Sequence, residues 1–214
     1  EVTFRYRGEI GGVNTTALEG TPTMDSFGIL YFVSPRSFTK SHATVYRARF
    51  SDGVATDVEI VPGIAKGKAP WVNFDLEVNA AGDRLYVVES RFGWLGRPKT
   101  ADIAVFELCG TVFKRTGDSD RILKLINTDR LEYAPCISAD ERELFFTRLN
   151  EITPAIYIAR RSSIDTPFGM PERIRSITGF AEGPTLSADG NILYFHRKDD
   201  GRYRIFLVRR EVSE

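Results

Sequence analysis

The chain has 214 residues, of which 42% are hydrophobic and 12% aromatic, and its 29 basic side chains balance 29 acidic ones. This composition supports a buried core, and the balanced charge provides no net field to attract nucleic acid or an anionic membrane. No apolar run reaches the roughly 18 residues that cross a bilayer, so we expect neither nucleic-acid binding nor membrane insertion.

The first ten residues, EVTFRYRGEI, contain neither a starting Met nor the apolar core of a signal peptide. We therefore expect that a leader was removed or that the chain was trimmed, and the sequence leaves open whether Glu1 is the mature terminus. The segment from Val2 to Ile10 has the length and composition of a β-strand.

Four similar units follow, at about 12–62, 63–118, 119–178 and 179–214. Each predicts an innermost strand, a tight turn, a second strand rich in aromatic residues, and a third strand after a variable loop. The aromatic markers of the second strands are Tyr31, Tyr86, Phe145 and Tyr194, so the unit recurs about every 50 residues. The third strands are expected from Val45, Ile103, Ile156 and Ile205, and fourth strands from Ala55, Gly110 and Pro171.

The turn between the first two strands is clearest at Ser187–Gly190. There Asp189 can accept hydrogen bonds from its own backbone, and Gly190 can take a positive φ. The pattern NTxxLExxP occurs at Asn14 and again at Asn127, which indicates an internal repeat. No segment shows a sustained helical period with caps, so we expect an all-β protein.

The last unit reaches Glu214 before a fourth strand appears, and the strand predicted at Val2–Ile10 could complete it. Units of this kind, closed by exchange of one strand, are typical of a β-propeller, whose closure hides the edges of its sheets. We therefore expect a single domain, residues 1–214, with four blades of four antiparallel strands. The alternative is a part of a five- or six-bladed ring.

The repeat, ExxPxxSxDGxxLYF followed by IYxARR, resembles the WD40-like PD40 propeller repeat of the TolB-like periplasmic proteins of bacteria. The resemblance covers nearly the whole chain, and its best copies begin at Glu132 and Glu182. In the second unit, Leu76 stands where the repeat has Pro and Asn79 replaces the Ser. The resemblance implies a periplasmic or secreted protein that binds a partner on one face of the ring, although the family also includes propeller domains attached to hydrolases.

In such a ring, the loops that enter the innermost strands share one face with the loops between the second and third strands. The entering segments carry Glu19, Asp75, Glu132 and Glu182, and the other loops add Arg36, Glu89, Arg91, Arg148, His196 and Arg197. These groups could hold a polar ligand or a channel cation such as Ca²⁺. Alternatively, each Glu bonds the backbone or an Arg of the neighbouring blade. Favouring positions that break the repeat, we select as binding-face candidates Trp71, Asp75, Glu89, Arg91, Trp94, Arg148 and His196.

The longest loop between a second and a third strand is predicted at Ser90–Asp102, and it contains Trp94 with Arg91 and Arg97. Exposed Trp and Arg are enriched in binding hot spots, so a partner or sugar site is plausible there. The alternative is that Trp94 folds back over a blade edge. Trp71 could likewise close the mouth of the channel.

Sequence motifs for catalysis are scarce. His42 and His196 have no Cys or acid at metal-ligand spacing, and neither a GxSxG elbow nor a phosphate-binding GxxxxGK[ST] loop occurs. Cys109 and Cys136 form no CxxC pair, and each is expected to be a small buried apolar residue.

Three function hypotheses follow. The preferred one is a non-catalytic binding propeller, without a cofactor, that presents its loop-rich face to a protein or oligosaccharide in the bacterial envelope. The second is a glycoside hydrolase or lyase, whose chemistry needs two carboxylates about 5 to 9.5 Å apart, with Asp75, Glu89 and Glu182 as candidates. The third is a structural ion ring, in which Glu19, Asp75, Glu132 and Glu182 hold a channel cation.

Overall fold

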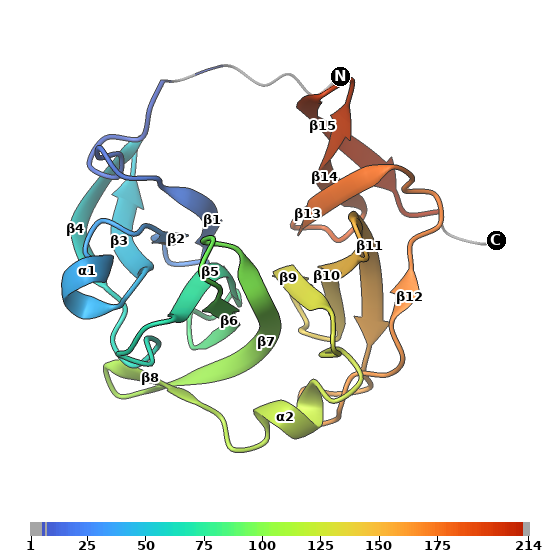
Figure 1. The fold of residues 1–214 in the computed structure, drawn as a ribbon, viewed down its shortest axis with the longest axis horizontal. Coiled ribbons are helices and arrows are strands. Elements are labelled where there is room, and N and C mark those ends of the chain that lie inside the picture. The colour runs from blue at the N-terminus through green and yellow to red at the C-terminus, as the bar shows by residue number, and fades with distance from the viewer. Residues whose placement is uncertain (1–5, 7, 212–214) are drawn as a thin grey trace.

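The computed structural model describes Tyr6 and residues 8–211, whose strands form three hydrogen-bonded sheets, of four, eight and three strands, around a central axis (Figure 1). The eight-stranded sheet consists of two antiparallel sets of four strands, here called the second and third sheets. The second and third sheets also touch through one parallel pair, Ala101 with Leu131. This arrangement confirms the predicted all-β propeller. The described part of the chain contains no helix long and apolar enough to span a membrane.

The strands follow the predicted units. The first sheet contains β1 (Gly20–Met24), β2 (Ile29–Val33), β3 (Val45–Ser51) and β4 (Val54–Ile60), and the second contains β5 (Trp71–Val78), β6 (Arg84–Phe92), β7 (Pro98–Cys109) and β8 (Val112–Arg115). The third contains β9 (Leu131–Ile137), β10 (Glu143–Asn150), β11 (Thr153–Arg160) and β12 (Glu172–Arg173), and the last contains β13 (Phe180–Leu186), β14 (Ile192–Asp199) and β15 (Arg202–Arg209). Two one-turn helices, α1 (Phe38–Ser41) and α2 (Ser119–Ile122), lie in the connections.

Two predicted elements differ from the structure. The fourth strand expected from Pro171 is only two residues long, because only Glu172 and Arg173 pair with β11. The loop expected at Ser90–Asp102 is mostly strand: β6 and β7 stay paired up to Phe92 and Pro98, so the connection is confined to residues 93–97.

The tight turns form as their side chains predict. Ser187 Oγ donates to Asp189 Oδ1 over 2.5 Å, and the same carboxylate oxygen accepts the Asn191 backbone N–H over 3.1 Å. Ser138 and Asp140 repeat the first contact at 2.7 Å. These local bonds reverse the chain and set the register of the two strands that follow.

Each innermost strand contains a β-bulge at the same place. Two residues are left out of the pairing with the second strand at Thr21–Pro22, Phe74–Asp75, Ala134–Pro135 and Gly183–Pro184. Thr21, Ala134 and Gly183 have positive φ values of 50°, 49° and 67°. Because a bulge re-aims the side chains beside it, these four sites determine which residues face the axis of the ring.

The core lies between the sheets. One cluster, around Tyr31, Leu85 and Phe113, joins the first sheet to the second, and another, around Tyr86, Ile103 and Phe146, joins the second to the third. A third cluster, around Phe145 and Phe195, joins the last two sheets. Burial of these apolar faces is the main term that holds neighbouring sheets together.

The strand proposed to close the ring, Val2–Ile10, lies mostly outside the described residues. Within them, Ile10 packs on the first sheet and Gly11 pairs in parallel with Val54 of β4. The last sheet has three strands in the described part of the chain, and β15 forms its outer edge.

Candidate functional site

Glu19 and Glu132 occupy equivalent structural sites. Glu132, fully buried, accepts from Thr128 Oγ1 at 2.6 Å and from Arg148 Nε at 2.7 Å. Glu19 has the same two kinds of partner, Thr15 Oγ1 at 2.8 Å and Arg36 at 3.1 Å.

Each arginine in these sites also stacks on two aromatic rings of its own sheet. Arg148 lies 5.4 Å from the Phe146 ring centroid and 4.9 Å from that of Tyr157, and Arg36 lies 5.2 Å and 4.9 Å from those of Phe32 and Tyr46. The arginine therefore comes from the same blade and not from the neighbouring one. The expected bond to the backbone does form, because Glu19 accepts the Thr15 N–H and Glu132 accepts the Thr128 N–H, each over 3.1 Å. Glu19, Glu132 and Arg148 therefore have a structural role, because each forms its ion pair within its own sheet.

Glu182 is not the counterpart of Glu132. Glu182 pairs with His196 and directly precedes the bulge, in the place that Tyr133 holds in the third sheet. The fourth unit is one residue shorter between Glu and Pro, and this shift turns Glu182 to the opposite side of the strand. Glu182 therefore faces the axis, whereas Glu132 faces its arginine.

The bulges of all four sheets line a central channel with a volume of about 610 Å³. Its charged and polar lining consists of Thr21, Asp75, Glu77, Tyr133, Glu182, Thr185 and His196, with Phe74 among the apolar residues. Asp75 occupies the bulge position that is proline in the other three sheets, where Leu76 was predicted. Of the sequence candidates, the channel brings together Asp75, Glu182 and His196.

Asp75 and Glu77 are unusual carboxyl groups. Asp75 is 8% exposed, and burial raises its pKa to about 7 although it accepts the N–H groups of Leu76 and Ala134. Burial also raises the pKa of Glu77 to about 7, and hydrogen bonds from Thr23, Ile137 and Cys136 only partly offset this. Near neutral pH, these two groups are therefore poised between the charged and the neutral form.

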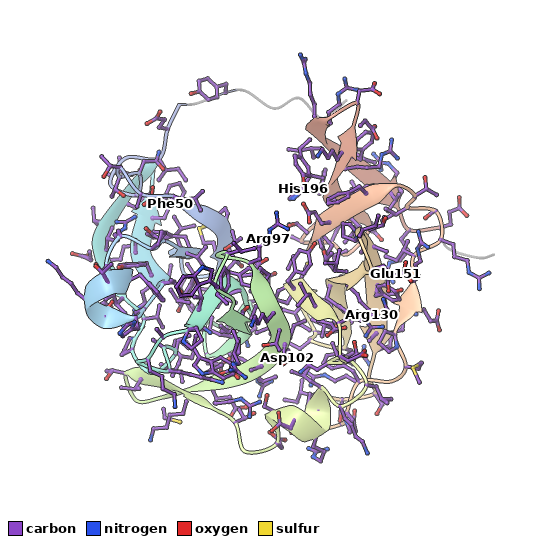
Figure 2. All side chains as sticks on the ribbon, viewed as in Figure 1. Phe50, Arg97, Asp102, Arg130, Glu151 and His196 are labelled. Carbon is purple, nitrogen blue, oxygen red and sulfur yellow. The ribbon has the colours of Figure 1, made fainter. Side chains whose placement is uncertain are left out.

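Glu182 is held by aromatic side chains. Tyr133 donates its hydroxyl to Glu182 Oε2 at 2.6 Å, while His196 Nε2 lies 3.9 Å from the other carboxylate oxygen. Tyr203 of β15 packs edge-on against His196, with ring centroids 5.8 Å apart. Figure 2 labels His196 on the last sheet.

Glu89, Trp71 and Arg91 form a separate cluster on the second sheet. Glu89 lies between Lys66 Nζ, at 3.1 Å, and Arg115 Nε, at 3.4 Å, and it does not line the channel. Lys66 Nζ lies 3.7 Å from the Trp71 ring centroid, and exposed Arg91 lies 5.8 Å from it. Trp71 is thus covered by cations and is not among the channel-lining residues.

Trp94 stands at the tip of the β6–β7 hairpin. It is fully exposed and the adjacent Leu95 is 81% exposed, so Trp94 does not cover a blade edge. Figure 2 labels Arg97, from the same connection, toward the middle of the ring.

The four acids of the ion-ring hypothesis are not brought together. Glu19 and Glu132 are held by their arginines, and among the described residues no group of three or more His, Cys, Asp or Glu side chains is arranged to hold a metal ion. Cys136 is buried, as expected, whereas Cys109 is exposed, contrary to expectation.

No protein-family model and no curated protein matches the chain. Solved structures do match it. A TolB candidate from Agrobacterium tumefaciens has a TM-score of 0.55 at 21% identity, with 91% of this chain and 59% of that one covered. A gluconolactonase from Xanthomonas campestris has a TM-score of 0.55 at 17% identity, with 85% and 56% covered. A nidogen/laminin complex has a TM-score of 0.56 at 13% identity, with 89% and 60% covered.

These likenesses, like the sheets themselves, define a β-propeller. More particularly, the chain is similar in structure to the TolB candidate, and it spans 59% of that protein's length. At such low identities the likeness shows the fold alone.

Proposed function

We propose that this propeller is a non-catalytic binding module of the PD40 type, which presents its loop-rich face to a protein or glycan partner in the bacterial envelope. The loop-rich face comprises the connections between second and third strands, at residues 34–44, 93–97, 151–152 and 200–201, and the segments that enter the innermost strands. The repeat resemblance supports the family and the envelope location.

The main observation in support of this proposal is the exposed tip of the β6–β7 hairpin. Trp94 and Leu95 expose large apolar side chains, and Arg91 and Arg97 are exposed beside them. An aromatic residue flanked by arginines is the composition of a binding hot spot, and pairing of β6 with β7 up to Phe92 holds the tip in a fixed position.

The test is retention of envelope proteins and of an oligosaccharide array by the purified chain and its W94A/L95A variant. We expect the wild type to retain a partner, and we expect the double variant to bind that partner at least about tenfold more weakly. Phe27→Ala is the matched control, because Phe27 is 76% exposed in the β1–β2 turn, at the other end of the strands. Equal binding by the wild type and the double variant, or equal loss in the control, contradicts the proposal.

The second candidate is a carbohydrate-active hydrolase or lyase. It is favoured by one observation: Asp75, whose pKa is raised to about 7, shares the channel with Glu182, and one carboxyl group with a raised pKa is what general acid catalysis of glycoside cleavage needs. Glu89 drops out of this hypothesis because it lies outside the channel. Turnover of oligosaccharides that Asp75→Asn abolishes without loss of folding would favour the enzyme.

A further inference from the structure

The central channel has the dimensions of a small-molecule site. Its volume of about 610 Å³ is within the range of about 300–1,000 Å³ that ligand pockets occupy. Its wall comes from β1, β5, β9 and β13, with His196 of β14, and none of its lining residues belongs to the hairpin tip of the proposed function.

The acidic groups of the channel have few basic groups opposite them. Asp75, Glu77 and Glu182 line it, and none of the described lining residues is Lys or Arg. His196 is the one basic group among them, at 3.9 Å from Glu182. Burial disfavours the ionised forms of Asp75 and Glu77, so a cation in the channel would supply the charge that the protein does not.

The uncharged part of the lining also suits a cation. The rings of Phe74 and Tyr133 lie 6.2 Å apart and tilted, and aromatic faces attract alkylammonium groups. At the first bulge, Thr21 Oγ1 is buried and has no hydrogen-bond partner in the described part of the chain. Buried polar atoms are nearly always paired, so the fold leaves this one polar group beside the channel unsatisfied.

We infer that the central channel binds a small organic cation, an alkylammonium compound held between the carboxylates of Asp75 and Glu182 and the rings of Phe74 and Tyr133. A bare metal ion fits less well, because the cavity is far larger than an ion and the described residues offer no metal-ligating group of three. The inference goes beyond the proposed function, and either can fail without the other.

Isothermal titration at pH 8 with two cations and their neutral counterparts tests this inference. The cations are choline and putrescine, and the counterparts are 3,3-dimethylbutan-1-ol and 1,4-butanediol. We expect at least one cation to bind and its counterpart to bind at least about tenfold more weakly, because the shapes match and only the charge differs.

Three variants locate the site. Glu182→Gln keeps an acceptor for Tyr133 but removes the charge, and it should weaken cation binding by about tenfold or more. Asp75→Asn should do the same at pH 8, and circular dichroism verifies that both variants fold. Glu151→Gln, in the exposed β10–β11 turn labelled in Figure 2, is the matched control and should bind as the wild type does.

Affinity should also depend on pH. Asp75 and Glu77 gain their charge as the pH rises through about 7, so choline, whose charge is constant, should bind about tenfold more tightly at pH 8 than at pH 6. Tyr133, Glu182 and His196 line the channel beside them, and Cys136 hydrogen-bonds Glu77. Burial raises the pKa of Tyr133 and that of Cys136, so both groups stay neutral between pH 6 and pH 8.

Binding of neither cation at concentrations up to about 10 mM, which corresponds to a free energy weaker than about −3 kcal/mol, overturns the inference. Equal binding of the neutral counterparts, or unchanged binding by Glu182→Gln, overturns it as well.

Discussion

Glu132 shows how this chain keeps a charged side chain at a fully buried position. Its carboxylate has a charged partner in Arg148 and a hydroxyl partner in Thr128, and Arg148 also donates to the Ile126 carbonyl oxygen at 2.7 Å. A buried ion pair of this kind is favourable only while all of its hydrogen-bonding groups are satisfied.

Removing the arginine should therefore be costly. We expect Arg148→Ala to lower the free energy of unfolding by about 3 kcal/mol or more, because the variant leaves the buried Glu132 carboxyl group without its charged partner. Urea denaturation measures this. Arg160→Ala breaks an ion pair whose arginine side chain is 55% exposed, so it should cost less than about 1 kcal/mol. Similar losses for the two variants would contradict the buried-charge argument.

The Asp75 carboxyl should make stability depend on pH. Its pKa is about 7 in the folded chain against 3.8 when unperturbed, so the folded state binds the proton more tightly than the unfolded state does. The neutral form is thus the one compatible with folding, and stability is lost as the pH rises from about 4 to about 7.

Asp75→Asn is neutral at every pH and should avoid this loss. We expect the variant to match the wild type near pH 4 and to be more stable by about 2 to 4 kcal/mol at pH 8, as measured by urea denaturation. For the control Glu151→Gln, the difference in unfolding free energy from the wild type should stay constant between pH 4 and pH 8. A variant that is less stable than the wild type at pH 8 would mean that the charged Asp75 stabilises the fold.

At the scale of the strand, the sequence predicted the elements better than their register. The recurring aromatic residues located every second and third strand, because side-chain alternation and turn residues are local signals. The β6–β7 hairpin was mistaken for a loop because its Gly, Pro and Arg residues are typical of loops, while pairing across the hairpin extends the strands.

The channel acids were harder to predict, because a β-bulge moves the register by one residue without a sequence signal of its own. Leu76 was aligned with the repeat proline, which concealed that Asp75 holds that position. The same misalignment hid Glu77, whose counterparts are the apolar residues Met24, Ile137 and Leu186. An acid among three apolar equivalents is the signal that the correct register would have provided.

The segment that enters the second sheet provides a test of element packing. Gly63 has a φ of 91°, and a Cβ placed there would lie 1.9 Å from the Phe113 carbonyl oxygen of β8. We expect Gly63→Ala to cost at least about 2 kcal/mol of unfolding free energy, because backbone must move to admit the methyl group.

Gly67 is the matched control for this substitution. It has a φ of 66° in the same segment, but a Cβ there meets no atom within 4 Å. Gly67→Ala should therefore show only the strain of the left-handed backbone, about 1 kcal/mol, in the same urea denaturation. Equal costs would show that the close approach to β8 adds nothing.

Across the whole molecule, the sheets are not equally buried. β6 has six consecutive buried residues, and it lies between the clusters that join the second sheet to both neighbours. β15 is mostly exposed, with Ile205 81% and Leu207 49% exposed, and it pairs only with β14 in the described part of the chain. Burial therefore falls from β6 in the second sheet to β15 at the outer edge of the last sheet.

This gradient should appear in amide hydrogen exchange. β15 should open far more readily than β6, since opening it exposes little apolar surface, so its amides should exchange at least about tenfold faster after correction for intrinsic rates. The ion pair between Arg210 and Glu143, at 2.6 Å, ties the end of β15 to the third sheet. Glu143→Gln should therefore speed exchange in β15 and leave β6 unchanged. Equal protection of β15 and β6 in the wild type would instead mean that another strand or a second copy of the chain covers the last blade.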